Sequence, residues 1–292
     1  MTNQMRSLMA PSDSPTEPPL PLTALTQPSP VAAAGLNPHR VVLVSTTDRA
    51  AGVRQAIELL QPPSFQGKRV FIKPNYNTGD PAPAATDPAV LEALVQEIQG
   101  AGASTITVGD RSGMANTRSA MQQMQVFALA ERYGFTPMVF DELGRDGWQY
   151  FSGEGTNWSR GFAITQPVLS SDAIVNACCL KTHRFGGHFT LSLKNTIGMV
   201  ARRVPGDEQG QKVRAGVVLA STDRIAIDAV GIAILRMLGT TREVSSGSIW
   251  SQAQIRRAAD LGLGATGPEQ IELVTADSAS AQVGDRLRPF LT

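Results

Sequence analysis

Three stretches of the chain carry side chains that can bind anions or transfer protons. They are Lys73-Pro74-Asn75-Tyr76-Asn77, Lys181-Thr182-His183 and Lys194-Asn195-Thr196-Ile197-Gly198. Ammonium and amide groups bind carboxylates and phosphates, and histidine transfers protons near neutral pH. With two carboxylates that also follow apolar runs, the candidate site residues are Lys73, Asn75, Asn77, Asp110, Lys181, His183, Lys194, Asn195 and Asp223.

The charge around the second and third stretches differs from that of the whole chain. Lys and Arg number 26 against 25 Asp and Glu, a net charge of +1. Between residues 181 and 214, by contrast, seven Lys or Arg (181, 184, 194, 202, 203, 212 and 214) face only Asp207 and Glu208. This local basic patch predicts a small anionic ligand. A solvated basic loop with a hydrogen-bonded histidine would give the same composition, and the sequence does not decide between the two.

The elements that must position these residues alternate between strands and helices. We expect strands near residues 40–45, 69–73, 104–109, 136–140, 173–177, 216–220 and 271–274. Helices are expected over residues 50–60, 117–133, 224–238 and 252–261, and another after Asp87-Pro88, where Asp87 caps the helix and Gly100 ends it. The pattern predicts an α/β fold with a mostly parallel sheet and helices on both faces.

In such a sheet the parallel strands end at one edge, where ligands bind. Lys73 ends one strand, Asp110 follows the next, Lys181 and His183 come after a third, and Asp223 follows a fourth. We therefore expect these groups to meet. Asp223 can also serve simply as the cap of the helix that follows, and Asp228 can form an ordinary helix ion pair with Arg224.

The first 38 residues hold eight of the 19 prolines, and we expect a disordered tail over residues 1–38 and a single domain over residues 39–292. No apolar run reaches the ~18 residues that span a bilayer. The near-neutral charge argues against nucleic acid as a partner. We expect a cytoplasmic protein that binds neither membrane nor nucleic acid; the oligomeric state stays open.

Other motifs favour structural roles. Cys178 and Cys179 are adjacent, which fits buried, inert thiols, and His183 and His188 lack the spacing of a helical metal site, so no metal site is expected. The glycines of Gly262–Gly267 match G-x-G-x-x-G, but they follow a predicted helix and precede a strand. A dinucleotide site requires the reverse order.

The chain resembles the DUF362 family, a domain of unknown function, from about residue 68 to 274. The resemblance rests on Ile72-Lys73-Pro74-Asn75, Thr86-Asp87-Pro88, Val108-Gly109-Asp110, Lys181-Thr182-His183, Thr190–Gly198, and Leu219–Asp223 followed by Ala226–Ala229. It implies that Lys73, Asn75, Lys181, His183, Lys194 and Asn195 are site residues. Many relatives carry a ferredoxin-like module; with two cysteines, this chain is expected to hold no iron–sulfur cluster. Gly198 and Ser221 are also closer together than the family pattern implies.

We expect an enzyme that acts on a small carboxylate-type substrate. Lys73, Lys181 and Lys194 would bind the anion, His183 would transfer a proton, and Asp110 or Asp223 would orient it. An isomerisation, epimerisation or elimination suits these groups. Two alternatives stay open: a redox or metal-dependent enzyme, with any metal or flavin cofactor unidentified, and a non-catalytic small-molecule-binding protein.

Overall fold

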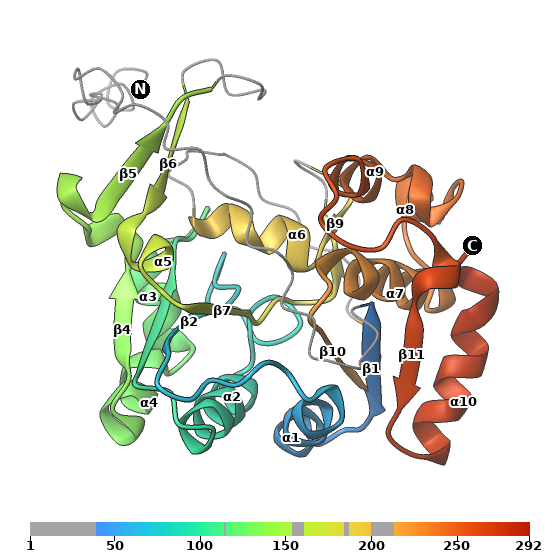
Figure 1. Cartoon of the computed structure of the whole chain (residues 1–292), viewed down its shortest axis with the longest axis horizontal. Coiled ribbons are helices and arrows are strands. Elements are labelled where there is room, and N and C mark those ends of the chain that lie inside the picture. Colours follow the sequence, from blue (N-terminus) through green and yellow to red (C-terminus); the bar gives the residue numbers. More distant parts are fainter. Residues whose placement is uncertain (1–38, 114, 154–160, 184–186, 200–212) are drawn as a thin grey trace, which may run out of the picture.

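The computed structural model describes residues 39–113, 115–153, 161–183, 187–199 and 213–292. The tail predicted over residues 1–38 lies outside the described residues, as does most of the shortened segment after Gly198. Within the described part, helices and strands alternate around two main sheets, and the predicted α/β class is confirmed (Figure 1).

The first sheet has four parallel strands in the order β4–β3–β2–β7. These strands are β2 (Arg69–Lys73), β3 (Thr105–Asp110), β4 (Thr136–Val139) and β7 (Ala173–Asn176). Side chains alternate across β2, so Val70 and Ile72 face one apolar cluster and Phe71 faces another. Because the strands run in the same direction, Lys73, Asp110 and Asn176 all lie at the carboxyl edge of this sheet.

Helices cover one face of this sheet. They are α2 (Pro88–Gly100), α3 (Thr117–Gln123) and α4 (Val126–Tyr133). The predicted start of α2 is confirmed: the Asp87 side chain accepts a 3.0 Å hydrogen bond from the Ala89 N–H, with proline in the first turn. The other face packs on Phe140, Val168 of α5 (Gln166–Leu169), and the hairpin of β5 (Trp148–Phe151) and β6 (Phe162–Thr165).

One predicted element is wrong in detail. The single helix expected over residues 117–133 is two helices, α3 and α4, separated at Gln125, whose φ is 60°. In one continuous helix Met124 and Val126 would point about 200° apart. Both side chains are buried in the same cluster, and the break between them makes this possible.

The second sheet has the order β10–β1–β11, with β1 (Arg40–Ser45), β10 (Val217–Ser221) and β11 (Glu272–Thr275). β10 runs antiparallel to β1 and pairs with none of the four parallel strands. The expectation that β10 ends at the same edge as β2 and β3 is therefore wrong. Strand periodicity indicates which residues are buried but not which strand is the neighbour.

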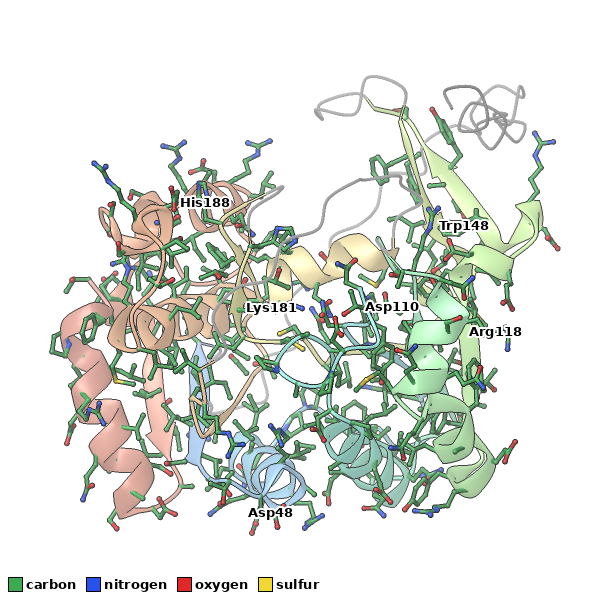
Figure 2. All side chains as sticks on the ribbon, turned by 180° about the vertical axis from the view of Figure 1, so that it is seen from behind. Asp48, Asp110, Arg118, Trp148, Lys181 and His188 are labelled. Carbon is green, nitrogen blue, oxygen red and sulfur yellow. The ribbon has the colours of Figure 1, made fainter. Side chains whose placement is uncertain are left out.

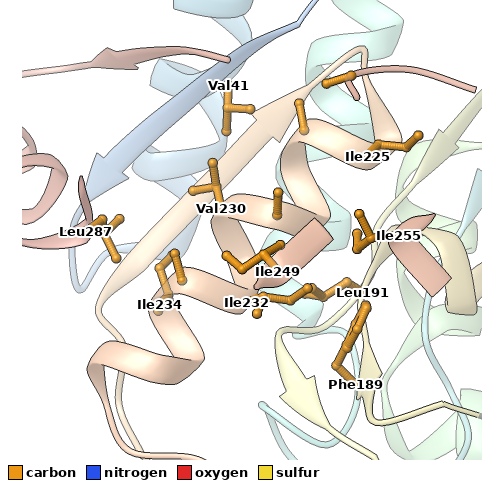
Figure 3. Close-up of a cluster of buried hydrophobic side chains, with 14 of the residues drawn as sticks. Val41, Phe189, Leu191, Ile225, Val230, Ile232, Ile234, Ile249, Ile255 and Leu287 are labelled. Carbon is orange, nitrogen blue, oxygen red and sulfur yellow. The ribbon is translucent and has the colours of Figure 1, made fainter. Parts of the chain in front are cut away.

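Helix α7 (Arg224–Met237) forms the centre of the second core. Its apolar side chains pack against Val41 of β1 and against Phe189 and Leu191, which precede α6 (Ser192–Asn195) (Figure 3). The remaining elements of this part are α8 (Arg242–Ser245), α9 (Ala253–Asp260) and α10 (Ser278–Leu287). Helix α1 (Arg49–Leu60) packs beside α2 and joins the two sheets.

A short ribbon links the two sheets. Strands β8 (Lys181–Thr182) and β9 (Phe189–Thr190) pair antiparallel, and α6 follows β9 directly, in the middle of the molecule (Figure 1). None of the helices in the part of the chain that the structure describes has the length and apolar composition to cross a bilayer.

Candidate functional site

The side chains at the ends of β2 and β3 form a buried ion pair. The Nζ atom of Lys73 lies 2.7 Å from Oδ1 of Asp110, and the two side chains are only 1% and 3% exposed. The same Nζ also donates to the Pro74 carbonyl at 2.5 Å. The structure thus brings together two predicted residues that are 37 positions apart, because parallel neighbours end at one edge.

Backbone amides complete the surroundings of Asp110. Its Oδ2 accepts from the Tyr76 N–H and its Oδ1 from the Arg111 N–H, both at 2.7 Å. Burial raises the pKa of the Asp110 carboxyl, while Lys73 and these two amides act in the opposite direction. Wherever the shared proton sits, the Lys73–Asp110 pair has no net charge. Lys73 therefore does not present a free positive charge to a ligand.

Gly198 lies directly against this ion pair. A Cβ atom at Gly198 would lie 2.7 Å from Asp110 Oδ1 and 2.7 Å from both Cε and Nζ of Lys73. Such distances are shorter than real Cβ contacts, so only glycine fits here without displacing the pair. Glycine at the end of the Lys194–Gly198 motif therefore allows the backbone to approach the Lys73–Asp110 pair closely, a role that the sequence pattern does not reveal.

Lys181 differs from Lys73 in its partners. Its Nζ donates to Oδ1 of Asn75 at 2.7 Å and to the carbonyl oxygen of Ala84. Both acceptors are neutral, and the Lys181 side chain is only partly buried. Burial is the largest influence on the pKa of this amine and lowers it, while Asp110 raises it by more than Lys73 lowers it. Lys181 and Asp110 lie near the centre of the molecule (Figure 2).

Three asparagine side chains extend from Lys181 into the interior. Nδ2 of Asn75 donates to Oδ1 of Asn195 at 2.8 Å, and Nδ2 of Asn195 donates to Oδ1 of Asn176 at 2.7 Å. Nδ2 of Asn176 in turn donates to the Ser192 carbonyl at 2.8 Å. Asn75 and Asn195 were predicted site residues. Asn176 was not predicted; it is the last residue of β7, whereas the predicted strand extends to residue 177.

Asp228 anchors the other side of α6. It is fully buried, and it accepts from the Ser192 N–H at 2.7 Å and the Leu193 N–H at 3.1 Å. Burial raises the pKa of its carboxyl to about 7, and the two amides oppose this more strongly than Arg224 does. The dominant role of Asp228 is thus to hold the first turn of α6, rather than the simple helix ion pair with Arg224 that the spacing suggested.

The other predicted residues of the Lys-Asn and His stretches lie around this network. Asn77 accepts from the Gly113 N–H at 2.8 Å through Oδ1 and so fixes the loop after β3. Lys194 is half-buried on α6 beside Asn195. His183 is partly buried and continues the β8–β9 pairing, with its N–H donating to the His188 carbonyl at 2.8 Å. His188 itself lies away from Lys181 and Asp110 (Figure 2).

Asp223 belongs to a different part of the molecule. Its Oδ1 accepts from the Ile225 and Ala226 N–H groups and caps α7; its Oδ2 accepts from Ala265 N at 2.8 Å and pairs with His39 Nδ1 at 2.5 Å. Four contacts fill the acceptor capacity of a carboxylate. The prediction that Asp223 joins Lys73 and Asp110 at one strand edge is wrong, because β10 lies in the other sheet.

The glycine motif and the two cysteines, for which we predict structural roles, have surroundings that fit those roles. Gly262 and Gly264 follow α9 and precede β11, the order that excludes a dinucleotide fingerprint. Gly264 lies against Asp223, where a Cβ would come within 2.2 Å of Oδ1. Burial raises the pKa of both cysteine thiols, Cys178 and Cys179, as expected for inert groups. Among the residues that the structure describes, no group of three His, Cys, Asp or Glu is placed to hold a metal ion.

A cavity of about 450 Å³ lies away from this network. It is lined by the first half of β2, from Arg69 to Phe71, by Thr105 and Thr107 of β3, and by residues of α5. Arg69 and Lys73 are four residues apart on β2, about 13 Å at the rise of a strand. We place the candidate site at the Lys181 network rather than at this cavity, because the groups that can bind anions or transfer protons gather there.

The comparisons with known proteins agree with the resemblance seen in the sequence. The model of the domain of unknown function DUF362 matches residues 70–207, which include Lys73, Asn75, Asp110, Lys181 and Asn195. Searches of curated proteins and of solved structures gave no match. The buried network therefore lies largely inside the matched segment, with Asp228 supporting it from outside. Over residues 70–207 the chain thus matches the model of the DUF362 family.

Proposed function

We propose that the protein is an enzyme that acts on a small carboxylate-bearing substrate at the Lys181 end of the asparagine network. The observation that carries this proposal is the setting of the Lys181 amine. The residue as a whole is neither fully buried nor fully exposed, and the amine donates its hydrogen bonds to two neutral oxygens, those of Asn75 and Ala84. Among the residues that the structure describes, no carboxylate is hydrogen-bonded to Lys181, so a carboxylate ligand beside its protonated form would be attracted to it.

The neighbouring ion pair supports this role. Lys73 and Asp110 neutralise each other in the interior, so Lys181 supplies the charge that a ligand meets. Two unit charges 4 Å apart attract by about 4 kcal/mol at the effective dielectric constant of a protein surface. Lys73 then acts by holding the strand ends and shaping the local field, and not by direct contact with the substrate.

His183 is the proposed proton-transfer group. It follows Lys181 by two positions on the β8–β9 ribbon, and residues two apart lie on the same side of extended chain. A histidine beside an anion-binding lysine can remove a proton from the carbon next to a carboxylate, while the lysine stabilises the negative charge that develops. An isomerisation, epimerisation or elimination follows from this arrangement.

The binding part of the proposal is tested by thermal stabilisation. A panel of small carboxylates is compared with the matching primary amides, which have the same shape without the charge. We expect carboxylates alone to raise the Tm, because a ligand stabilises the folded state by mass action. Lys181→Gln should abolish the shift and Lys68→Gln should preserve it. Equal shifts in the two variants would overturn the proposed anion site.

The proton-transfer part is tested with the acids that bind. Incubation in D₂O should place deuterium on the carbon next to the carboxylate, as measured by mass spectrometry. His183→Gln should lower this exchange by about 100-fold or more, the contribution of a positioned acid–base group. Full exchange in His183→Gln, with binding unchanged, would show that another group transfers the proton.

A further inference from the structure

We infer that Lys181 is a nucleophilic amine that forms an imine with the carbonyl group of an oxo-carboxylate substrate. This inference rests on the proposed function for the position of the carboxylate, and it names the substrate class more narrowly. It assigns to Lys181 a covalent role in addition to its electrostatic one.

The two hydrogen bonds of Lys181 leave one tetrahedral direction of its nitrogen open. A neutral amine has two N–H bonds and one lone pair. The two donors are accounted for by Asn75 Oδ1, at 2.7 Å, and by the carbonyl oxygen of Ala84. The fourth tetrahedral direction then belongs to the lone pair. The residue as a whole is neither fully buried nor fully exposed.

The contrast with Lys73 shows why this lysine is singled out. Lys73 Nζ contacts a carboxylate at 2.7 Å and its side chain is 1% exposed, so this amine is not accessible to a ligand. Burial is the largest influence on the pKa of Lys181 and lowers it. Desolvation is one of the means by which enzymes activate lysine nucleophiles.

The chemical step balances without another reactant. The lone pair of Lys181 attacks the carbonyl carbon, a carbon–nitrogen bond forms, and the π electrons move to the carbonyl oxygen. That oxygen leaves as water and carries away the two amine protons. The imine nitrogen then takes one proton from solvent, and its N–H can donate again to Asn75 or Ala84.

The protonated imine would also serve the proposed proton transfer. It retains the positive charge that attracts the substrate carboxylate, and it withdraws electrons from the adjacent carbon. In a 3-oxo acid that carbon lies between the imine and the carboxylate, so its C–H bond becomes more acidic and a base such as His183 can remove the proton.

Reductive trapping on the full-length protein tests the inference. The probe is glyoxylate, a small oxo-carboxylate, with sodium cyanoborohydride to reduce the imine, followed by peptide mass mapping. The chain has five lysines, Lys68, Lys73, Lys181, Lys194 and Lys212, so every amine side chain can be followed. We expect Lys181 to be labelled on the order of tenfold faster at pH 7.5 than Lys68, a lysine of the same intermediate exposure. Labelling of Lys181 no faster than Lys68 would overturn the inference.

The wild-type protein supplies a second measurement that needs no variant. The labelling rate of Lys181 should reach half its maximum at a lower pH than that of Lys68, because the neutral amine reacts. Asn75→Asp should slow labelling at Lys181 and not at Lys68, since a carboxylate beside the amine keeps it protonated. Coincident pH profiles for the two lysines would contradict the inference even if Asn75→Asp fails to fold.

Glycolate separates this inference from the proposed function. It has the carboxylate of glyoxylate but a hydroxyl group in place of the aldehyde. If both compounds raise the Tm and no adduct forms at Lys181, anion binding stands and the covalent role is wrong. If Lys181 is labelled rapidly but neither compound raises the Tm, and acetaldehyde labels equally fast, the amine is nucleophilic and the carboxylate site is wrong.

Discussion

The Lys181 amine and the Asp228 carboxylate are the two ends of one continuous chain of hydrogen bonds. Between them lie three asparagine side chains and one peptide unit, in the order Asn75, Asn195, Asn176, and the Ser192 carbonyl with the Leu193 N–H. Each group in this series of hydrogen bonds donates to the next group in the direction of Asp228. Aligned donors polarise one another in a low-dielectric interior, so the charge at Asp228 makes Asn75 a stronger acceptor for Lys181.

The buried carboxyl of Asp228 should make stability depend on pH. Its pKa is raised to about 7 in the folded protein against 3.8 for the free group, so the folded state binds more protons between these values. Stability from this group is fully present below about pH 4 and is lost as the pH rises through about 7, at up to roughly 1.4 kcal/mol per pH unit. Asp228→Asn should flatten this decline, measured by urea unfolding from pH 5 to 8.

The control for that experiment is Asp285→Asn, which replaces an exposed carboxylate paired with Arg288. It should leave the pH dependence unchanged. The side-chain amide that Asp228→Asn introduces has a single acceptor oxygen for two backbone N–H groups, so the stability of this variant at pH 5 should be lower by about 1–3 kcal/mol. Identical slopes for the wild type and Asp228→Asn would show that Asp228 does not titrate as proposed.

Gly198→Ala should destabilise the protein. The new methyl group would lie 2.7 Å from Asp110 Oδ1 and from Lys73 Nζ, and the buried pair has little room to move. We expect a loss of about 1–3 kcal/mol, typical of overpacking. Gly100→Ala is the matched control, because nothing lies within 4 Å of its Cβ position. A loss no larger in Gly198→Ala than in Gly100→Ala would contradict the close approach.

The Lys73–Asp110 pair should show strong energetic coupling. Lys73→Met or Asp110→Asn alone leaves one buried group without its partner and should cost about 3–5 kcal/mol. The double variant should lose less than the sum of the two, by about 1–3 kcal/mol, because no unpaired charge remains. A double-mutant cycle from urea unfolding measures this. Strict additivity would mean that the two groups do not interact.

Asp223→Ala should separate stability from ligand binding. It removes the cap of α7 and the contacts to Ala265 and His39, so the loss should exceed the ~0.5–2 kcal/mol of a cap alone. Asp277→Ala is the comparison, since Asp277 caps α10 through Ser280. Carboxylate stabilisation should persist in Asp223→Ala. Loss of carboxylate stabilisation in a variant that is still folded would show that Asp223 contributes to the binding site.

Much of the first sheet can be predicted from the sequence. The apolar run Arg69–Lys73 and the cap at Asp87 define β2 and the start of α2, and both are found where predicted. Local patterns suffice here because strand alternation and capping depend on near neighbours. The parallel direction of β2 and β3 then places Lys73 beside Asp110, because both strands end at one edge.

The surroundings of Asp223 and Asp228, by contrast, were decided by the tertiary structure alone. β10 has the apolar pattern of any strand, and only its pairing with β1 shows that Asp223 belongs to the second sheet. The spacing of Arg224 and Asp228 fits an ordinary helix ion pair, yet packing of α7 against α6 buries Asp228 and gives it amide partners. Sequence determines which groups are available. Burial and partners set whether each is charged, neutral or reactive, and both come from segments far apart in the chain.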